Sequence, residues 1–274
     1  MNTRALRVAI LSMYRRQDAP GLLYLRHLLR YESRNFGLPD IHFREFQTRD
    51  AGEIPETAEF DVFISTGGPG NPFDGEGSAW EKAYFGFLDK IYAQEPAEPK
   101  KFLFSICHSF QLLCRYFSIA EVRQREGKTR FGIFSAGACQ EGTEDPLFGH
   151  LPNPYLIVEN RNWECVNGDK TRMASLGIKV LARENADQNS ALLALRISPA
   201  WVATQFHPET QPEEMKRQFL TEAKRKEVIS THGKEAWEET ILRLDAKKPS
   251  LQETWELLLP RFLAEASAAF CKTI

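Results

Sequence analysis

Cys107 is the residue of this chain best placed for nucleophilic chemistry. A continuous apolar run at residues 101–106 predicts a strand buried in a parallel sheet, and apolar residues at helical spacing follow the cysteine directly. A thiol at such a junction faces the positive end of the helix dipole and unpaired backbone N–H groups, which favour the thiolate. The strand-to-helix junction therefore predicts an activated cysteine.

A base for this nucleophile is predicted much later in the chain, within residues 204–209. His207 ends a predicted strand, Pro208 fixes the local backbone, and Glu209 is placed to accept the second ring N–H of the imidazole. Such a carboxylate holds the tautomer and stabilises the imidazolium. We therefore expect Cys107, His207 and Glu209 to meet in the fold as a catalytic triad.

A glycine-rich turn, Gly67-Gly68-Pro69-Gly70, follows another predicted strand. Acyl transfer through a thioester forms a tetrahedral oxyanion, which needs preorganised N–H donors. We expect Gly68 and the backbone N–H of His108 to form this oxyanion hole. Gln111 lies four residues after the cysteine on the same helix face, so it is expected to contact the substrate. Gly67, in the glycine turn, is expected to contact the substrate as well.

The elements that must position these residues alternate between strand and helix. Strand patterns occur at residues 5–13, 41–46, 60–64 and 101–106, and helical patterns at residues 21–36, 78–92 and after the cysteine. This alternation predicts an α/β fold with a doubly wound, mostly parallel sheet in a flavodoxin-like three-layer arrangement. The glycine turn and the cysteine then lie at the carboxyl ends of strands, where the sites of such folds gather.

The segment from residue 130 to residue 206 has a different pattern, with short strands joined by polar turns. This pattern predicts antiparallel hairpins added to the sheet. The expected strands cover residues 131–135, 155–158, 179–182, 191–196 and 201–205.

The remainder of the chain is expected to be helical. Capping-box patterns at residues 210–213 and 250–253 predict helix starts, and Pro260 predicts a kink. An apolar stripe in the last helix indicates either an extension packed on the same domain, which we favour, or a surface that binds a partner. The predicted division is a domain at residues 1–210 and a helical extension at residues 211–274.

Composition and charge argue against several classes of function. The 274 residues carry a net charge of −2 without a clustered basic face, so nucleic acid is not an expected partner. No apolar run approaches the roughly 18 residues that span a bilayer, and no signal-peptide core is evident at the amino terminus. We expect a cytoplasmic protein without a membrane partner.

The sequence predicts neither a metal nor a cofactor. Its five cysteines form an odd set without CxxC pairs, which argues against a structural zinc site or a disulfide framework. No GxxxxGK[ST] motif occurs, and no GxGxxG motif follows the first strand, so the glycine turn is not a phosphate loop.

Three blocks together resemble those of class I glutamine amidotransferases: the glycine turn at residues 67–70, the cysteine elbow with Gln111, and residues 205–209. The resemblance covers roughly residues 5–210. It implies a Cys-His-Glu triad that attacks the side-chain amide of glutamine, forms a γ-glutamyl thioester, and releases ammonia and glutamate. It also implies that the glycine turn and the residue after the cysteine form the oxyanion hole.

The resemblance leaves three functions open. The first is glutamine hydrolysis that supplies ammonia to a separate synthetase subunit. The second is hydrolysis of other γ-glutamyl compounds, such as γ-glutamyl peptides or polyamine conjugates. The third is a catalytically silent homologue with a regulatory or binding role.

This chain departs from the family pattern at two places. Ser105 and Ser109 stand where the family usually has glycines around the nucleophile, which predicts a reshaped pocket or an altered substrate specificity. Residues 158–163 lack the histidine that many members carry at a strand turn. These departures remove no member of the expected triad.

Overall fold

The computed structural model describes residues 4–15, 19–94, 100–127, 129–185, 187–247 and 249–271. The strands found within these residues are β1 (Leu6–Leu11), β2 (Ile41–Phe46), β3 (Val62–Ser65), β4 (Phe102–Ile106), β5 (Glu121–Gln124), β6 (Arg130–Ala138), β7 (Tyr155–Arg161), β8 (Trp163–Val166), β9 (Lys179–Arg183), β10 (Leu192–Ser198) and β11 (Trp201–Thr204).

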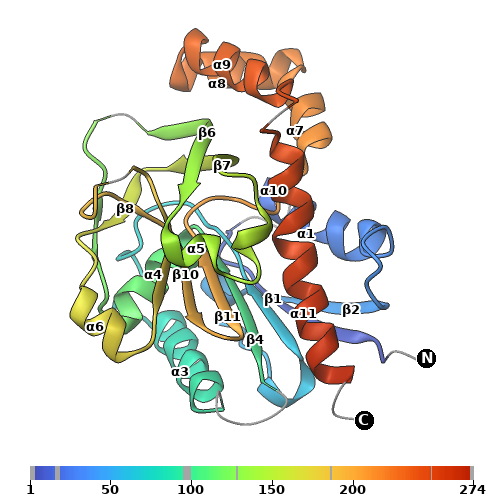
Figure 1. Ribbon diagram of the computed structural model, residues 1–274, viewed down its shortest axis with the longest axis vertical. Coiled ribbons are helices and arrows are strands. Elements are labelled where there is room, and N and C mark those ends of the chain that lie inside the picture. The colour runs from blue at the N-terminus through green and yellow to red at the C-terminus, as the bar shows by residue number, and fades with distance from the viewer. Residues whose placement is uncertain are drawn as a thin grey trace.

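A mixed sheet in the order β2-β1-β3-β4-β11-β10-β9-β6-β7 forms the centre of the protein (Figure 1). The pairs from β2 to β11 are parallel, and those from β11 to β7 are antiparallel. β5 and β8 form a separate antiparallel pair. The predicted α/β fold with added antiparallel strands is confirmed, although β11, expected among the hairpins, is also the parallel neighbour of β4.

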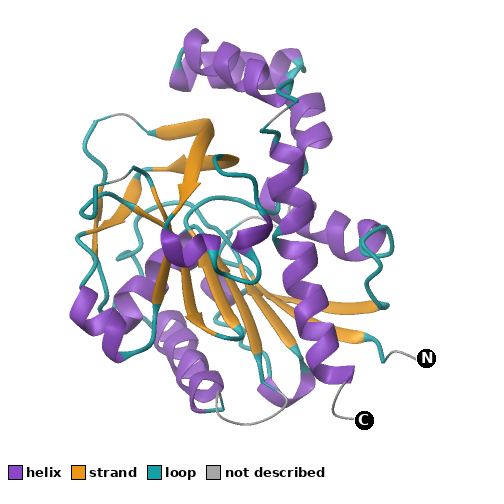
Figure 2. Cartoon of the chain, viewed as in Figure 1, coloured by secondary structure: helices purple, strands orange, loops and turns teal. Residues whose placement is uncertain are grey.

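Helices connect and cover the strands. They are α1 (Pro20–His27), α2 (Thr48–Ala51), α3 (Ala79–Ala93), α4 (His108–Phe117), α5 (Gln140–Thr143), α6 (Lys170–Ser175), α7 (Pro212–Phe219), α8 (Glu222–His232), α9 (Lys234–Leu244), α10 (Leu251–Leu257) and α11 (Leu259–Cys271). Figure 2 shows these helices around the strands, with a helical segment rising beyond one end of the sheet.

Aromatic contacts show how α3 and α11 cover opposite faces of the sheet. Phe63 of β3 lies beside Leu103 of β4 in register, and its ring packs 5.0 Å from Phe87 of α3. Phe104 comes one residue after Leu103 and therefore points to the other face. There its ring packs 5.1 Å from Phe262 of α11. The buried strands read as continuous apolar runs because both faces are covered.

The chain after residue 210 follows the predicted helices with two corrections. Gln211, not Thr210, caps α7, because its side chain accepts a hydrogen bond from the Glu214 N–H. The apolar residues Met215, Phe219 and Ala223 have the spacing of one helix, but the helix is broken between α7 and α8, where Thr221 caps α8. The second capping box is confirmed at Ser250. The predicted kink is confirmed as a break between α10 and α11, next to Pro260.

The C-terminal helices contact the sheet at two places. α10 and α11 pack on it, and the Thr254 hydroxyl donates to the Leu156 carbonyl. α7, α8 and α9 pack against the projecting part of β6, where Phe131 stacks on Phe219 and on His232. α8 and α9 lie farthest from the parallel strands (Figure 1). The division into residues 1–210 and 211–274 stays a prediction.

The strands β5 and β8 were not predicted, because each has only four residues, includes charged side chains and shows no clear alternation. They pair with each other beside α4. None of the helices in the described ranges combines the length and the apolar character that crossing a bilayer requires.

Candidate active site

Cys107 lies in a sharp turn between β4 and α4. Its backbone has φ 48° and ψ −96°, a conformation that costs energy for a residue with a side chain. The turn is fixed on both sides, since the Cys107 N–H donates to the Thr204 carbonyl at 2.7 Å and its carbonyl accepts from the Gln111 N–H at 3.1 Å. A nucleophile elbow of this kind presents the side chain at the end of the sheet.

His207 and Glu209 follow β11, the strand next to β4. His207 Nδ1 lies 2.7 Å from Glu209 Oε1, and Cys107 is close enough to the imidazole to raise its pKa. Burial alone would lower the pKa of His207, but the charges of Glu209 and Cys107 raise it well above its usual value. The structure therefore brings the three predicted triad residues together, with the histidine between two acidic groups.

The glycine turn follows β3 and lies against the same site. A Cβ at Gly67 would come within 2.8 Å of His207 Cε1, and a Cβ at Gly68 would overlap the Met13 carbonyl. Neither position has room for a larger residue. No described residue accepts a hydrogen bond from the N–H of Gly68 or of His108. Both N–H groups are thus available to a ligand, as an oxyanion hole requires.

Two arginines hold the loop that continues from the glycine turn. Arg49, almost completely buried, donates to the Pro69 carbonyl, and Arg115 of α4 donates to the Pro72 carbonyl at 2.6 Å. Arg115 also pairs with Glu81 of α3. These contacts fix the glycine turn relative to α4, so the two expected oxyanion donors belong to one rigid unit.

His108 contributes a backbone N–H, but its side chain is also unusual. The imidazole is 1% exposed, and neither ring nitrogen has a hydrogen-bond partner among the described residues. Burial, together with the charges of Arg49 and Arg115, lowers its pKa to about 3. The ring is therefore neutral at physiological pH and does not compete with His207 as a base.

Two glutamines link the cysteine to the wall of the site. Gln205 donates from Nε2 to Cys107 Sγ at 3.7 Å, and its Oε1 accepts from Gln111 Nε2 at 3.2 Å. Gln111 also donates to the Trp163 carbonyl at 3.3 Å. Sequence analysis had assigned no role to the Gln205 side chain. Since Gln205 directly follows β11, which pairs with β4, the adjacency of these two strands was the available signal.

Tyr14 is a second residue near the triad that sequence analysis missed. Its hydroxyl lies between Gly67 and Gly21, because a Cβ built on Gly67 would be 3.1 Å from the hydroxyl and a Cβ built on Gly21 would overlap it. The same Cβ on Gly21 would lie 3.0 Å from Glu209 Oε1, so the Tyr14 hydroxyl is close to the triad. Burial and the charges of Glu209 and Cys107 raise the pKa of Tyr14 well above its usual value, so it keeps its proton. Its place just after β1, at a strand's carboxyl end, was the available signal.

The two serines at the elbow have structural contacts. Ser109 Oγ donates to the Thr66 carbonyl at 2.7 Å and lies 2.8 Å from Ser65 Oγ. It therefore ties the start of α4 to the residue before the glycine turn. Ser105 is fully buried in β4, opposite Ser65 in β3. Neither serine lines the cavity described next, so a reshaped pocket stays a prediction.

A cavity of about 710 Å³ opens beside Cys107. Its lining comes from the predicted site and from other parts of the chain: the turn after β1 with the start of α1, the start of β6, the end of β7 with the start of β8, and the helices α7 and α8. Gly68, Gln111, His207 and Glu209 line it together with the cysteine, whereas Gly67 packs behind His207.

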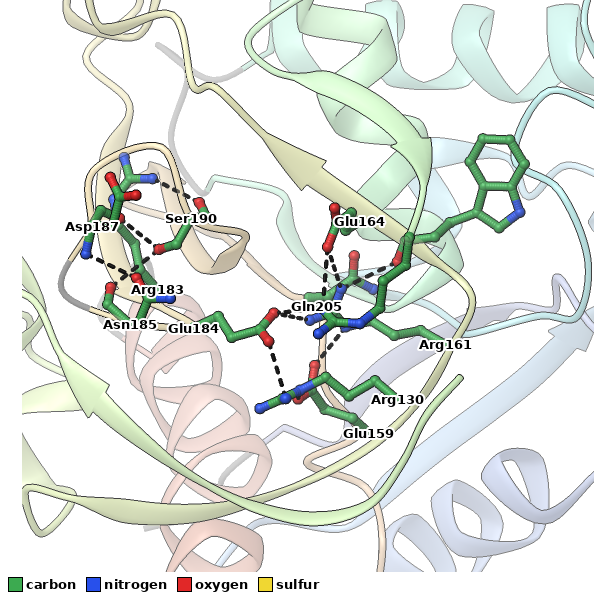
Figure 3. A network of polar contacts seen from close by, with 12 residues as sticks. Arg130, Glu159, Arg161, Glu164, Arg183, Glu184, Asn185, Asp187, Ser190 and Gln205 are labelled. Atoms are coloured by element: carbon green, nitrogen blue, oxygen red, sulfur yellow. Dashed lines mark hydrogen bonds and ion pairs between the residues drawn. The ribbon is translucent and has the colours of Figure 1, made fainter. Parts of the chain in front are cut away.

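A buried ion network forms the cavity wall at the end of β7, where the family's histidine is missing (Figure 3). Arg161 Nε lies 2.6 Å from Glu159, and its Nη2 lies 2.8 Å from Glu184. Arg130 pairs with the same two carboxylates. Burial would lower the pKa of Arg161, but its two carboxylate partners raise it. Because these charges satisfy one another, they hold the wall in place instead of offering a free charge.

Within the part of the chain that the structure describes, no group of three or more His, Cys, Asp or Glu side chains is arranged to hold a metal ion.

The family model "Glutamine amidotransferase class-I" matches residues 25–225, most of the chain. The chain belongs to this family. The resemblance noted from three sequence blocks is thereby confirmed. Among the curated proteins that were compared, none matches the sequence.

Solved structures share the fold of this amidotransferase domain at low sequence identity. A glutamine amidotransferase from Thermotoga maritima is 16% identical, with a TM-score of 0.67, and the match covers 95% of this chain and 99% of that one. One from Methylobacillus flagellatus is 17% identical, with a TM-score of 0.57 and coverage of 98% and 95%. The glutaminase domain of Trypanosoma brucei CTPS, solved with bound acivicin, is 12% identical, with a TM-score of 0.56 and coverage of 75% and 86%.

Proposed function

We propose that this protein hydrolyses the side-chain amide of glutamine, or of a related γ-glutamyl compound, through a thioester on Cys107. The observation that carries the proposal is the contact of one imidazole, His207, with both a cysteine in a strained elbow and a buried carboxylate. Membership of the amidotransferase family agrees with it.

The first half-reaction forms the thioester. The Cys107 sulfur attacks the γ-amide carbonyl carbon, and the carbonyl oxygen becomes an oxyanion between the N–H groups of Gly68 and His108. His207 Nδ1 is engaged with Glu209, so Nε2 faces the reaction. It donates its proton to the amide nitrogen, the carbon–nitrogen bond breaks, and ammonia or an amine leaves.

The second half-reaction regenerates the enzyme. Water attacks the thioester carbonyl, and His207 accepts a proton from it. The carbon–sulfur bond then breaks, which releases the γ-carboxylate of glutamate and restores the thiolate beside the imidazolium. Glu209 keeps the ring orientation in both steps.

Two uses of such a site differ in the fate of the leaving group. The fold neighbours include a putative GMP synthase subunit from Thermoplasma acidophilum and PurLQS from Thermotoga maritima, which support transfer of ammonia to a separate synthetase subunit. Hydrolysis of larger γ-glutamyl amides needs no ammonia acceptor. The volume of the cavity favours this second use.

The proposal is tested by measuring glutamate release from glutamine and from γ-glutamyl methylamide by the wild type and by Cys107→Ala. We expect release by the wild type and loss of at least about a thousandfold in the variant. Cys114→Ala is the matched control, because Cys114 is buried one helix turn beyond the site and does not line the cavity. Release that survives Cys107→Ala would contradict the proposal.

A further inference from the structure

The cavity beside Cys107 is much larger than glutamine requires. A molecule of the size of glutamine displaces five or six waters, roughly 150–200 Å³ at the volume of liquid water. The cavity measures about 710 Å³, in the range of sites that enclose considerably larger ligands. A substrate that fills it must therefore extend well beyond a glutamine side chain and its α-carbon.

The direction of this extra space follows from the proton transfer. His207 must protonate the departing nitrogen, so the leaving group lies on the His207 side of the scissile bond. The chain runs from His207 directly into α7, and residues of α7 line the same cavity. Gln111 lies on the cysteine side, where Gln205 links it to the sulfur, and the glycine turn contacts both Cys107 and His207. The additional volume thus faces the leaving group.

We call this outer part of the cavity the outer chamber. Its wall is apolar. It consists of Tyr24 of α1, Phe131 of β6, Val158 of β7, and Met215 and Phe219 of α7. These side chains belong to a hydrophobic cluster that is separate from the main core. Phe131 and Phe219 stack with ring planes 13° apart.

Two pairs of polar side chains border the outer chamber. The Tyr24 hydroxyl lies 3.3 Å from Gln218 Oε1, and Lys224 lies 2.8 Å from Glu227 at the rim. The apolar wall suits a part of the ligand that gains by burying apolar surface.

We propose that the outer chamber binds the leaving amine of the substrate, and that this amine has an apolar alkyl or arylalkyl body. The substrate class is then a γ-glutamyl amide of such an amine, and the inference rests on the function proposed above. The bond changes are the same: the amide carbon–nitrogen bond breaks, His207 supplies the proton to the amine nitrogen, and water later releases glutamate from Cys107.

The test is a series of γ-glutamyl amides of methylamine, butylamine and phenethylamine, whose amines have similar basicity. Each buried methylene contributes about a three- to fourfold gain in binding. We expect kcat/KM of the wild type to rise along the series, with the phenethylamide at least about tenfold above the methylamide. A flat series, or one that falls with size, would overturn the inference while leaving hydrolysis at Cys107 intact.

Phe219→Ala removes part of the outer chamber and should lower the ratio of phenethylamide to methylamide activity at least about threefold. Leu220→Ala is the matched control, because Leu220 is the next residue but is 58% exposed, and its ratio should equal that of the wild type. An unchanged ratio in Phe219→Ala would contradict the chamber assignment. If glutamine is hydrolysed and no amide of the series is, the inference fails and the proposed function stands; if glutamine is not hydrolysed either, both fail.

Discussion

The two histidines beside Cys107, His108 and His207, have pKa values shifted in opposite directions. Burial by itself lowers the pKa of both. His207 faces a carboxylate and the cysteine sulfur, and its pKa rises well above the usual value. His108 faces two arginines and has no hydrogen-bond partner among the described residues, and its pKa falls to about 3.

Burial lowers the pKa of both histidines, and the neighbouring charges decide whether that effect is reversed, as at His207, or reinforced, as at His108. The anionic side can hold and transfer a proton. The cationic side, where Arg49 and Arg115 fix the glycine turn, keeps His108 neutral and presents backbone N–H groups to a developing oxyanion.

The largest expected effect comes from exchanging each histidine for glutamine. His207→Gln removes the general acid and base, so kcat/KM should fall at least about a thousandfold. His108→Gln keeps the backbone N–H and should stay within about tenfold of the wild type, provided that both variants fold. The kcat/KM values of both variants are measured by glutamate release from glutamine or a γ-glutamyl amide. Equal losses would contradict the assignment of distinct roles.

His108 should also make the protein sensitive to acid. Its folded pKa of about 3 lies below the value of roughly 6.5 expected in the unfolded chain. Between these two pH values the unfolded state binds a proton at His108 and the folded state does not. The free energy of unfolding therefore decreases as the pH falls from about 6.5 towards 3. Between pH 7 and pH 4 this group accounts for up to about 3 kcal/mol.

Urea unfolding of the wild type and of His108→Leu at both pH values measures this contribution. The variant should lose less stability than the wild type on acidification, whatever its stability at pH 7. Parallel losses in the two proteins would show that His108 is not the group responsible.

A smaller effect is expected from Glu209→Gln. The charge of Glu209 raises the pKa of His207, so the variant imidazolium should lose its proton at a lower pH. The alkaline limb of kcat/KM against pH should then move to lower pH by about one unit or more. The pH profile of the variant, compared with that of the wild type, measures this shift. An unmoved alkaline limb would mean that Glu209 does not control the charge of His207.

Much of this arrangement could be predicted from the sequence because it depends on local patterns. The alternation of strands and helices, the elbow at Cys107 and the turn at Gly67 and Gly68 each occupy a short stretch of chain. The elbow and the glycine turn then lie close together, because the carboxyl ends of parallel strands lie at the same edge of the sheet.

The rest depends on contacts between distant segments. Arg49 and Tyr14 look like ordinary surface or strand-end residues in the sequence, yet both are packed beside the site. The network of Arg161, Glu159 and Glu184 likewise joins β7 to the end of β9. The outer chamber forms only because α7 packs beside β6, and no local sequence pattern predicts this contact.

The most direct test of the central claim is covalent labelling with a glutamine-like chloroketone, followed by peptide mass spectrometry. We predict one label per chain, on Cys107 and on none of the other four cysteines, with protection by substrate and much slower labelling in His207→Gln. Labelling spread over several cysteines, or equally fast labelling of Cys107 without His207, would contradict a nucleophile activated by the imidazole.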